Sequence, residues 1–205
     1  MISDKYKCVF IHIPKTAGMS VEKMLCKSYR RFHQTKPWNI KHGGPMSRHY
    51  KKYFNGNNDY FKFTIVRNPW DRAVSLFYYE KMMVKFNPNA RRKKAKKYFN
   101  KYGDEGFSEF ITSKGIGWKD VKNSGSLWRR QAPFLWGDYD YICRFENLEK
   151  DMKKVCKQLN IPFSEFPWVN KGDRDTDYRK YYKEESKEII SNLYKEDIDI
   201  LGYEF

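Results

Sequence analysis

Four side chains in the first half of the sequence are suited to handling a strongly anionic ligand: Lys15, His42, Arg67 and Ser75. Lysine and arginine bind phosphate-like groups, arginine through two parallel hydrogen bonds, and a serine hydroxyl can share the same anion. Histidine titrates near neutral pH and suits removal of a proton from a hydroxyl. The combination indicates chemistry on a phosphate- or sulfate-bearing ligand.

Lys15 lies in a turn between an expected strand and an expected helix. Cys8 to Ile13 is a continuous apolar run of strand length, Pro14 ends it, and apolar residues at helical spacing begin at Val21 after Gly18. The first N–H groups of a helix have no intrahelical partner, and the helix dipole adds positive charge there. This turn is therefore predicted to bind an anion.

Arg67 lies at the end of a second strand that opens a second helix. Phe61 to Val66 has strand composition, Asn68 is a good helix cap, and Pro69 suits the first helical position. Ser75 follows about two turns into that helix, and ligands bind at the carboxyl ends of strands in open α/β sheets. Two such turns predict one ligand with two separated anionic groups.

The remaining pattern alternates strands with helices. We expect a third strand at 139–144, helices at 148–159 and 183–194, a short helix at 107–112, and an end to the helix from Pro69 before Asn87. Alternation of this kind implies a parallel sheet with right-handed crossovers. The predicted fold is α/β: a single domain over 1–205, with a central parallel sheet flanked by helices and a mobile basic insert at about 87–126.

These motifs resemble the carbohydrate sulfotransferase family, in the group that includes the heparan sulfate 2-O-sulfotransferases and compact bacterial and phage relatives. Ile13-Pro-Lys-Thr-Ala-Gly18 is similar to the family's 5′-phosphosulfate loop, and Val66-Arg-Asn-Pro-Trp-Asp-Arg72 followed by Ser75 is similar to its 3′-phosphate motif. The resemblance continues through Cys143–Leu148 and from Val169 to Tyr203, so it spans nearly the whole chain. It implies a P-loop-like nucleotide-binding architecture.

The resemblance also implies a donor and its contacts. The donor is 3′-phosphoadenosine 5′-phosphosulfate (PAPS), no metal is expected, and Lys15 is assigned to the charge that builds on the 5′-phosphate. Arg67 and Ser75 are assigned to the 3′-phosphate, and Lys171-Gly172 is similar to the basic loop that closes over that side. The residues of the 5′-phosphate loop are Pro14, Lys15, Thr16, Ala17, Gly18, Met19 and Ser20. Met19 stands where the family usually has Thr or Ser, which removes one hydroxyl contact.

His42 is the candidate general base, because it lies in the loop between the two motifs, where the resembled family places its catalytic histidine. His49 and Glu146 remain alternatives, since some relatives use a glutamate. His12, in the strand before the loop, is expected to be structural. Each assigned residue also has an ordinary explanation: a solvated Lys15, a salt bridge from Arg67 to Asp71, a Ser75 hydroxyl bonded within its helix, and a solvated loop at 171–172.

Composition favours an anionic partner. The 205 residues carry a formal charge of +16 and are 40% hydrophobic, which suits one domain with a core. The charge favours a nucleotide, a sulfated or carboxylated glycan, nucleic acid or an acidic membrane surface as partner. The basic run at 91–97 is a solvated face or a surface that steers an anionic acceptor. The scattered cysteines at 8, 26, 143 and 156 predict reduced thiols rather than a disulfide framework. Without an apolar segment of membrane-spanning length, we expect a cytoplasmic protein.

Two other classes remain as competitors. A nucleoside triphosphate-dependent kinase would share the α/β pattern, but the sequence has no GxxxxGK[ST] motif. A basic nucleic-acid-binding protein would explain the charge and the 18% aromatic content, although no recognised motif accompanies them. A sulfotransferase acting on a hydroxyl, expected to be that of a saccharide, explains more of the sequence. Residues 32–59 and 85–135 are expected to determine the acceptor, and their sequence has no pattern that identifies it.

Overall fold

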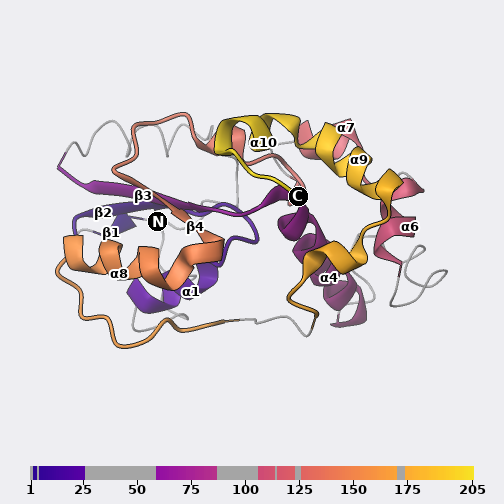
Figure 1. The fold of residues 1–205 in the computed structure, drawn as a ribbon. Coiled ribbons are helices and arrows are strands. Elements are labelled where there is room, and N and C mark those ends of the chain that lie inside the picture. The colour runs from indigo at the N-terminus through magenta and orange to yellow at the C-terminus, as the bar shows by residue number, and fades with distance from the viewer. Residues whose placement is uncertain are drawn as a thin grey trace. The chain divides into compact units, whose positions relative to one another are not determined.

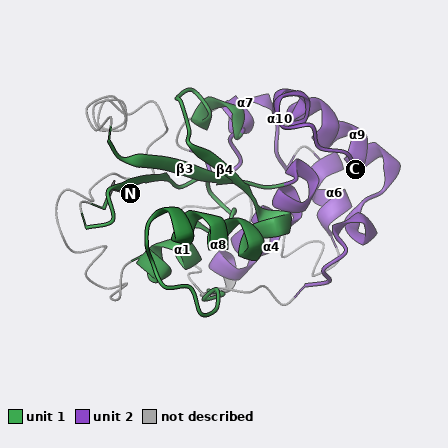
Figure 2. Cartoon of the chain, turned by 60° about the vertical axis from the view of Figure 1, so that its left-hand side comes forward, with its two compact units in different colours: residues 1–67, 131–171 green, residues 68–130, 172–205 purple. Residues whose placement is uncertain are grey.

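The structure is a computed structural model that describes residues 2–3, 5–25, 59–86, 106–113, 115–122, 126–169 and 174–205. Contacts divide the chain into two compact units, coloured separately in Figure 2. The first comprises residues 1–67 and 131–171, and the second comprises 68–130 and 172–205. Each unit is therefore assembled from two separate stretches of sequence.

The first unit contains a four-stranded sheet in the order β1-β2-β3-β4. Its strands are β1 (Ile2–Ser3), β2 (Cys8–Ile11), β3 (Phe61–Val66) and β4 (Tyr141–Arg144). β1 pairs antiparallel with β2, whereas β2, β3 and β4 run parallel, with Ile11 opposite Thr64 and Val66 opposite Arg144. This arrangement confirms the predicted α/β class with a parallel sheet.

All of β2 and the last four residues of β3 are buried, as expected for inner strands of a parallel sheet with continuous apolar runs. Helices α1 (Gly18–Leu25) and α8 (Leu148–Gln158) lie on the same side of it (Figure 1). Phe10, Ile65 and Cys143 from the strands share a buried cluster with residues of both helices. Cys8, Cys143 and Cys156 are buried free thiols, and burial raises the pKa of Cys156 to about 11. The prediction of reduced thiols is confirmed at these three positions, and Cys26 lies outside the described residues.

The second unit is helical. Its elements are α4 (Pro69–Phe86), α6 (Phe107–Thr112), α7 (Trp118–Lys122), the 3-10 turn η4 (Tyr178–Tyr181), α9 (Glu184–Leu193) and α10 (Lys195–Leu201). Trp70, Phe77, Phe110, Trp128 and Tyr194 form the centre of its core. Aromatic rings dominate this core, and the Phe77 and Phe107 rings meet edge to face at 5.5 Å between centroids.

The start of α4 follows the sequence prediction. The Asn68 side chain accepts hydrogen bonds from the N–H groups of Trp70, at 3.0 Å, and Asp71, at 3.4 Å, as an N-cap does. Pro69 occupies the first helical position. The predicted short helix at 107–112 is likewise confirmed. α4 reaches Phe86, the last residue described before residue 106.

Several boundaries differ from the prediction. β2 ends at Ile11 rather than Ile13, and β4 begins at Tyr141 rather than Tyr139. Helices α7 and α10 were not predicted, because each is too short for a helical pattern to be recognised. α10 ends at Leu201, and the residue after it, Gly202, has a φ of 63°, the left-handed conformation that glycine adopts readily. Ile200, in α10, is 59% exposed.

Among the described residues, no helix combines the length and apolar character needed to cross a bilayer.

Candidate active site

The loop between β2 and α1 contains Lys15 and has an unusual backbone. Lys15 and Ala17 both have positive φ values, of 69° and 67°. For residues with a Cβ such conformations cost about 1–3 kcal/mol each, and they cluster at ligand sites. The Thr16 hydroxyl is buried and donates to the Ile13 carbonyl at 2.9 Å, so this hydrogen bond joins the two sides of the turn. Turns of this kind direct successive N–H groups to one side, where they can bind an anion.

Gly18 begins α1 beneath the His12 ring. A Cβ built on Gly18 would lie 2.1 Å from His12 Cδ2 and 2.3 Å from its Nε2, distances that real side chains do not tolerate. The His12 Nδ1 atom lies 2.9 Å from Glu22 Oε1, so the ring is held from its far side by α1. The role expected for His12 was structural, and these contacts show the ring packing the loop against the helix.

Ser20 ties the loop to a distant part of the same unit. Its buried hydroxyl accepts a hydrogen bond from the Val169 N–H at 3.0 Å. Its own N–H donates to the Ala17 carbonyl at 2.9 Å, so that N–H is already used within the first turn. The structure therefore brings the segment just before Lys171 to the loop, while Lys171 and Gly172 lie outside the described residues.

Arg67 lies directly after β3, at the carboxyl end of the parallel sheet. Its Nη1 donates to the carbonyl oxygen of Lys15 at 3.0 Å, and its guanidinium carbon lies 3.7 Å from the centroid of the Phe145 ring. Only 6% of Arg67 is exposed. The two motifs predicted from the sequence therefore meet within the first unit, through a hydrogen bond between residues 52 positions apart.

Gln131 holds the main chain of Arg67, which the sequence did not predict. Its Oε1 accepts from the Arg67 N–H at 3.0 Å, and its Nε2 donates to the Arg67 carbonyl at 2.8 Å. Gln131 is completely buried. No local pattern could have identified it, because a single glutamine acts here on a residue 64 positions away.

The rest of the second motif belongs to the helical unit. Asp71 forms an ion pair with Arg174 at 2.5 Å, and the fully buried Arg72 donates to the carbonyls of Leu127 and Arg129. These contacts brace the helical unit. Ser75 is half-buried in α4, and its assignment to a phosphate remains a prediction.

Of the other assigned residues, the structure describes only Glu146. Glu146 is exposed in the 3-10 turn η3 (Phe145–Asn147) that follows β4. The remaining candidates lie outside the described residues: His42, His49, Lys171, Gly172 and the basic run at 91–97.

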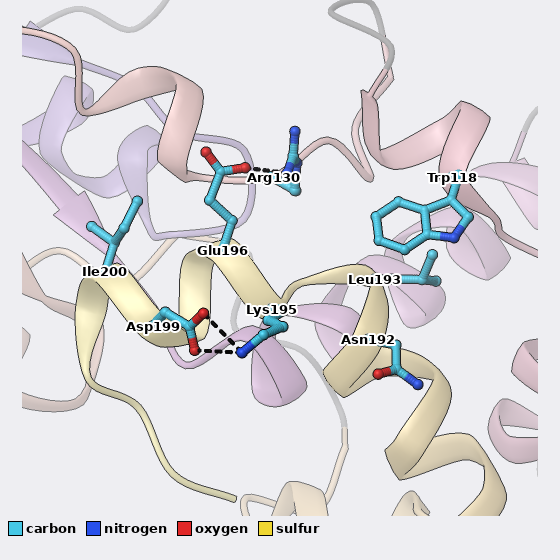
Figure 3. Close-up of a pocket in the computed structure, with 8 residues that line it drawn as sticks. All are labelled: Trp118, Arg130, Asn192, Leu193, Lys195, Glu196, Asp199 and Ile200. Carbon is cyan, nitrogen blue, oxygen red and sulfur yellow. Dashed lines mark hydrogen bonds and ion pairs between the residues drawn. The ribbon is translucent and has the colours of Figure 1, made fainter.

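A pocket of about 380 Å³ is present in the second unit (Figure 3). Arg130 pairs with Glu196 and Lys195 pairs with Asp199, so the cations around it are balanced by carboxylates. Its lining consists of Trp118, Arg130, Asn192, Leu193, Lys195, Glu196, Asp199 and Ile200. This charge balance suits a strongly anionic nucleotide less well than the loop around Lys15 does.

Comparison with known proteins shows the family of the chain. A model described as the sulfotransferase family matches residues 1–204, and the chain therefore belongs to the sulfotransferase family. Membership makes it an enzyme of sulfuryl transfer, and the family implies a nucleotide donor and a hydroxyl-bearing acceptor. No curated protein and no solved structure matched the chain.

Proposed function

We propose that the protein transfers a sulfuryl group from PAPS to a hydroxyl group of a saccharide. The observation that carries this proposal is the hydrogen bond from Arg67 to the Lys15 carbonyl. It joins Arg67, which directly follows the parallel strand β3, to Lys15, which lies in the loop between β2 and α1. A donor with a phosphosulfate at one end and a phosphate at the other fits two such groups.

The loop residues have different roles at the 5′ end of the donor. Pro14 shapes the start of the loop, and the N–H groups from Thr16 to Met19 hold the 5′-phosphate. The left-handed backbone at Lys15 and Ala17 supports an arrangement of N–H groups facing one side. Ser20 contributes by anchoring the loop through its hydroxyl, since its N–H is already used. Lys15 balances the negative charge that builds on the leaving phosphate.

The 3′ end of the donor is assigned to Arg67 and Ser75, with Lys171-Gly172 closing over it. A guanidinium can bind a phosphate through two parallel N–H groups, which a lysine cannot do. The burial of Arg67 against Phe145 supports this role, because a desolvated cation binds an anion more strongly than a solvated one.

The reaction is an in-line displacement at sulfur. The acceptor oxygen forms a bond to sulfur while the bond from sulfur to the 5′-phosphate oxygen breaks, and adenosine 3′,5′-bisphosphate leaves with the electron pair. His42 takes the proton of the acceptor hydroxyl. Positioning and electrostatics supply the rate enhancement, so no metal is expected.

The acceptor is proposed to be a saccharide or another hydroxyl-bearing compound, and the excess of cationic residues would favour one that is anionic. The test is a screen of glycans and small alcohols with labelled PAPS, followed by location of the new sulfate by mass spectrometry. Sulfate on a saccharide hydroxyl supports the full proposal. Transfer only to non-saccharide alcohols would overturn the acceptor class, and absence of any transfer across the screen would count against the PAPS assignment.

A further inference from the structure

Arg67 is held at both its main chain and its side chain. β3 pairs with β4 as far as Val66 and Arg144, so the peptide groups of Arg67 lie beyond the regular ladder. Buried peptide groups need hydrogen-bond partners, and the Gln131 amide supplies an acceptor and a donor to this one residue. Gln131 thus takes the place of a neighbouring strand where the sheet ends.

Phe145 supports the other end of Arg67. The guanidinium carbon lies 3.7 Å from the ring centroid, within the range of a cation–π interaction. Phe145 directly follows β4, and the Asp151 carboxylate accepts the N–H of Arg144 at 2.9 Å, which fixes the chain where Phe145 leaves the strand. Trp168 packs against the Phe145 ring edge to face, with 6.1 Å between centroids.

The position of Arg67 also affects the loop. Its Nη1 donates to the carbonyl of Lys15, whose φ of 69° needs support from outside the residue. A displaced guanidinium would remove that support. Gln131 and Phe145 hold Arg67, and Arg67 in turn holds the backbone of Lys15. They therefore affect the position of the Lys15 side chain indirectly.

We propose that Gln131 and Phe145 are positioning residues of the donor site, which hold Arg67 so that recognition of the 3′-phosphate is coupled to the Lys15 loop. This inference rests on the proposed function, because it takes Arg67 as the residue that binds the 3′-phosphate. It adds two residues that touch neither donor phosphate but determine how strongly the protein distinguishes a 3′-phosphorylated nucleotide from one without that group.

The test compares two nucleotides that differ by one phosphate. Affinities for adenosine 3′,5′-bisphosphate and adenosine 5′-monophosphate are measured by calorimetry on the intact protein, and their ratio is the readout. Loss of folded protein lowers the active fraction equally for both nucleotides, so a purely structural defect leaves the ratio of affinities unchanged. Gln131→Met keeps the side-chain length without the amide, and it should lower the ratio about tenfold.

Phe145→Leu provides an independent test at a half-buried position, where folding is less at risk. It removes the aromatic face and should lower the ratio of affinities about threefold to tenfold. Phe145→Tyr retains the aromatic face and should keep the wild-type ratio. Matched controls in the same unit are Gln158→Met, at an exposed position on α8, and Phe163→Leu, and both should keep the wild-type ratio.

Two results would overturn the inference, and they are distinguishable. If the wild-type protein prefers the bisphosphate and the variants at Gln131 and Phe145 keep that preference, the positioning role is wrong while the donor assignment stands. If the wild-type protein shows no preference for the bisphosphate, the 3′-phosphate assignment of Arg67 fails, and the positioning role fails with it.

Discussion

Two buried arginines, five positions apart in one motif, lie in surroundings of opposite kinds. Arg67, in the first unit, lies on the Phe145 ring and donates to the carbonyl of Lys15, in a loop with a left-handed backbone. Arg72, in the second unit, is completely buried and donates to the carbonyls of Leu127 and Arg129. Burial lowers the pKa of the Arg72 guanidinium, while the nearby Tyr194 and Asp197 oppose that change.

The difference indicates how one short motif serves two purposes. Arg72 satisfies carbonyl oxygens within a helical core, so its contacts stabilise the fold. Arg67 contacts the loop that carries Lys15, at the carboxyl edge of a parallel sheet where α/β proteins bind ligands. Substitutions at the two arginines should therefore produce different defects: unfolding at Arg72 and weaker nucleotide binding at Arg67.

The largest effect is expected for Arg72→Ala. Removal of the buried guanidinium leaves carbonyl oxygens without a donor and opens a cavity, so the free energy of unfolding should fall by about 3–5 kcal/mol. Urea denaturation followed by circular dichroism measures this quantity. Arg179→Ala, at an exposed position in η4, is the control and should unfold like the wild type. Wild-type stability in Arg72→Ala would mean that this arginine is not a structural brace.

Lys15→Ala should give the largest loss of activity with little change in stability. Removing one group that stabilises transition-state charge typically lowers the turnover number about 10²–10³-fold. The assay is release of adenosine 3′,5′-bisphosphate with an acceptor identified by the screen. Lys7→Ala is a matched control, because Lys7 is also a lysine with positive φ, 49°, but lies before β2. Full turnover in Lys15→Ala would remove Lys15 from its proposed role.

Arg67→Ala should chiefly weaken nucleotide binding. Loss of charged hydrogen bonds to a phosphate should reduce affinity for adenosine 3′,5′-bisphosphate about 10–100-fold, as measured by calorimetry. Arg67→Lys keeps the charge without the two parallel donors and should fall between the alanine variant and the wild type. If Arg67→Ala bound the bisphosphate as tightly as the wild type, the two arginines would not differ in the way proposed.

The smallest effect is expected for Ser75→Ala. One neutral hydroxyl contributes about 0.5–1.5 kcal/mol, so the affinity for the bisphosphate should fall between about twofold and tenfold. Ser113→Ala, at an exposed serine after α6, should leave that affinity unchanged. Equal affinities in Ser75→Ala and Ser113→Ala would restrict the 3′-phosphate contact to Arg67.

Features encoded in local runs of sequence could be predicted. The apolar runs at Cys8 and Phe61 identified β2 and β3, and Asn68-Pro69 identified the start of α4, because strand burial and helix capping depend on neighbouring residues. The meeting of Lys15 and Arg67 followed from parallel pairing, which brings the carboxyl ends of strands to one edge.

Features that depend on contacts between distant residues could not be predicted. Gln131 acts through its side chain on a distant peptide group, and the Phe145 ring is recognisable as a support only once the Arg67 guanidinium lies on it. The left-handed backbone of Lys15 and Ala17 has no glycine to signal it. His42 remains a prediction from its place between the motifs, since it lies outside the described residues.

We propose that the loop of Lys15 and the residue Arg67 together bind a 3′-phosphorylated nucleotide. The most direct measurement is calorimetric titration of the wild-type protein with adenosine 3′,5′-bisphosphate and, separately, with ATP in the presence of magnesium. We expect clearly tighter binding of the bisphosphate, without a requirement for magnesium. Tighter binding of ATP with magnesium would contradict it and favour a nucleoside triphosphate as the ligand of this loop.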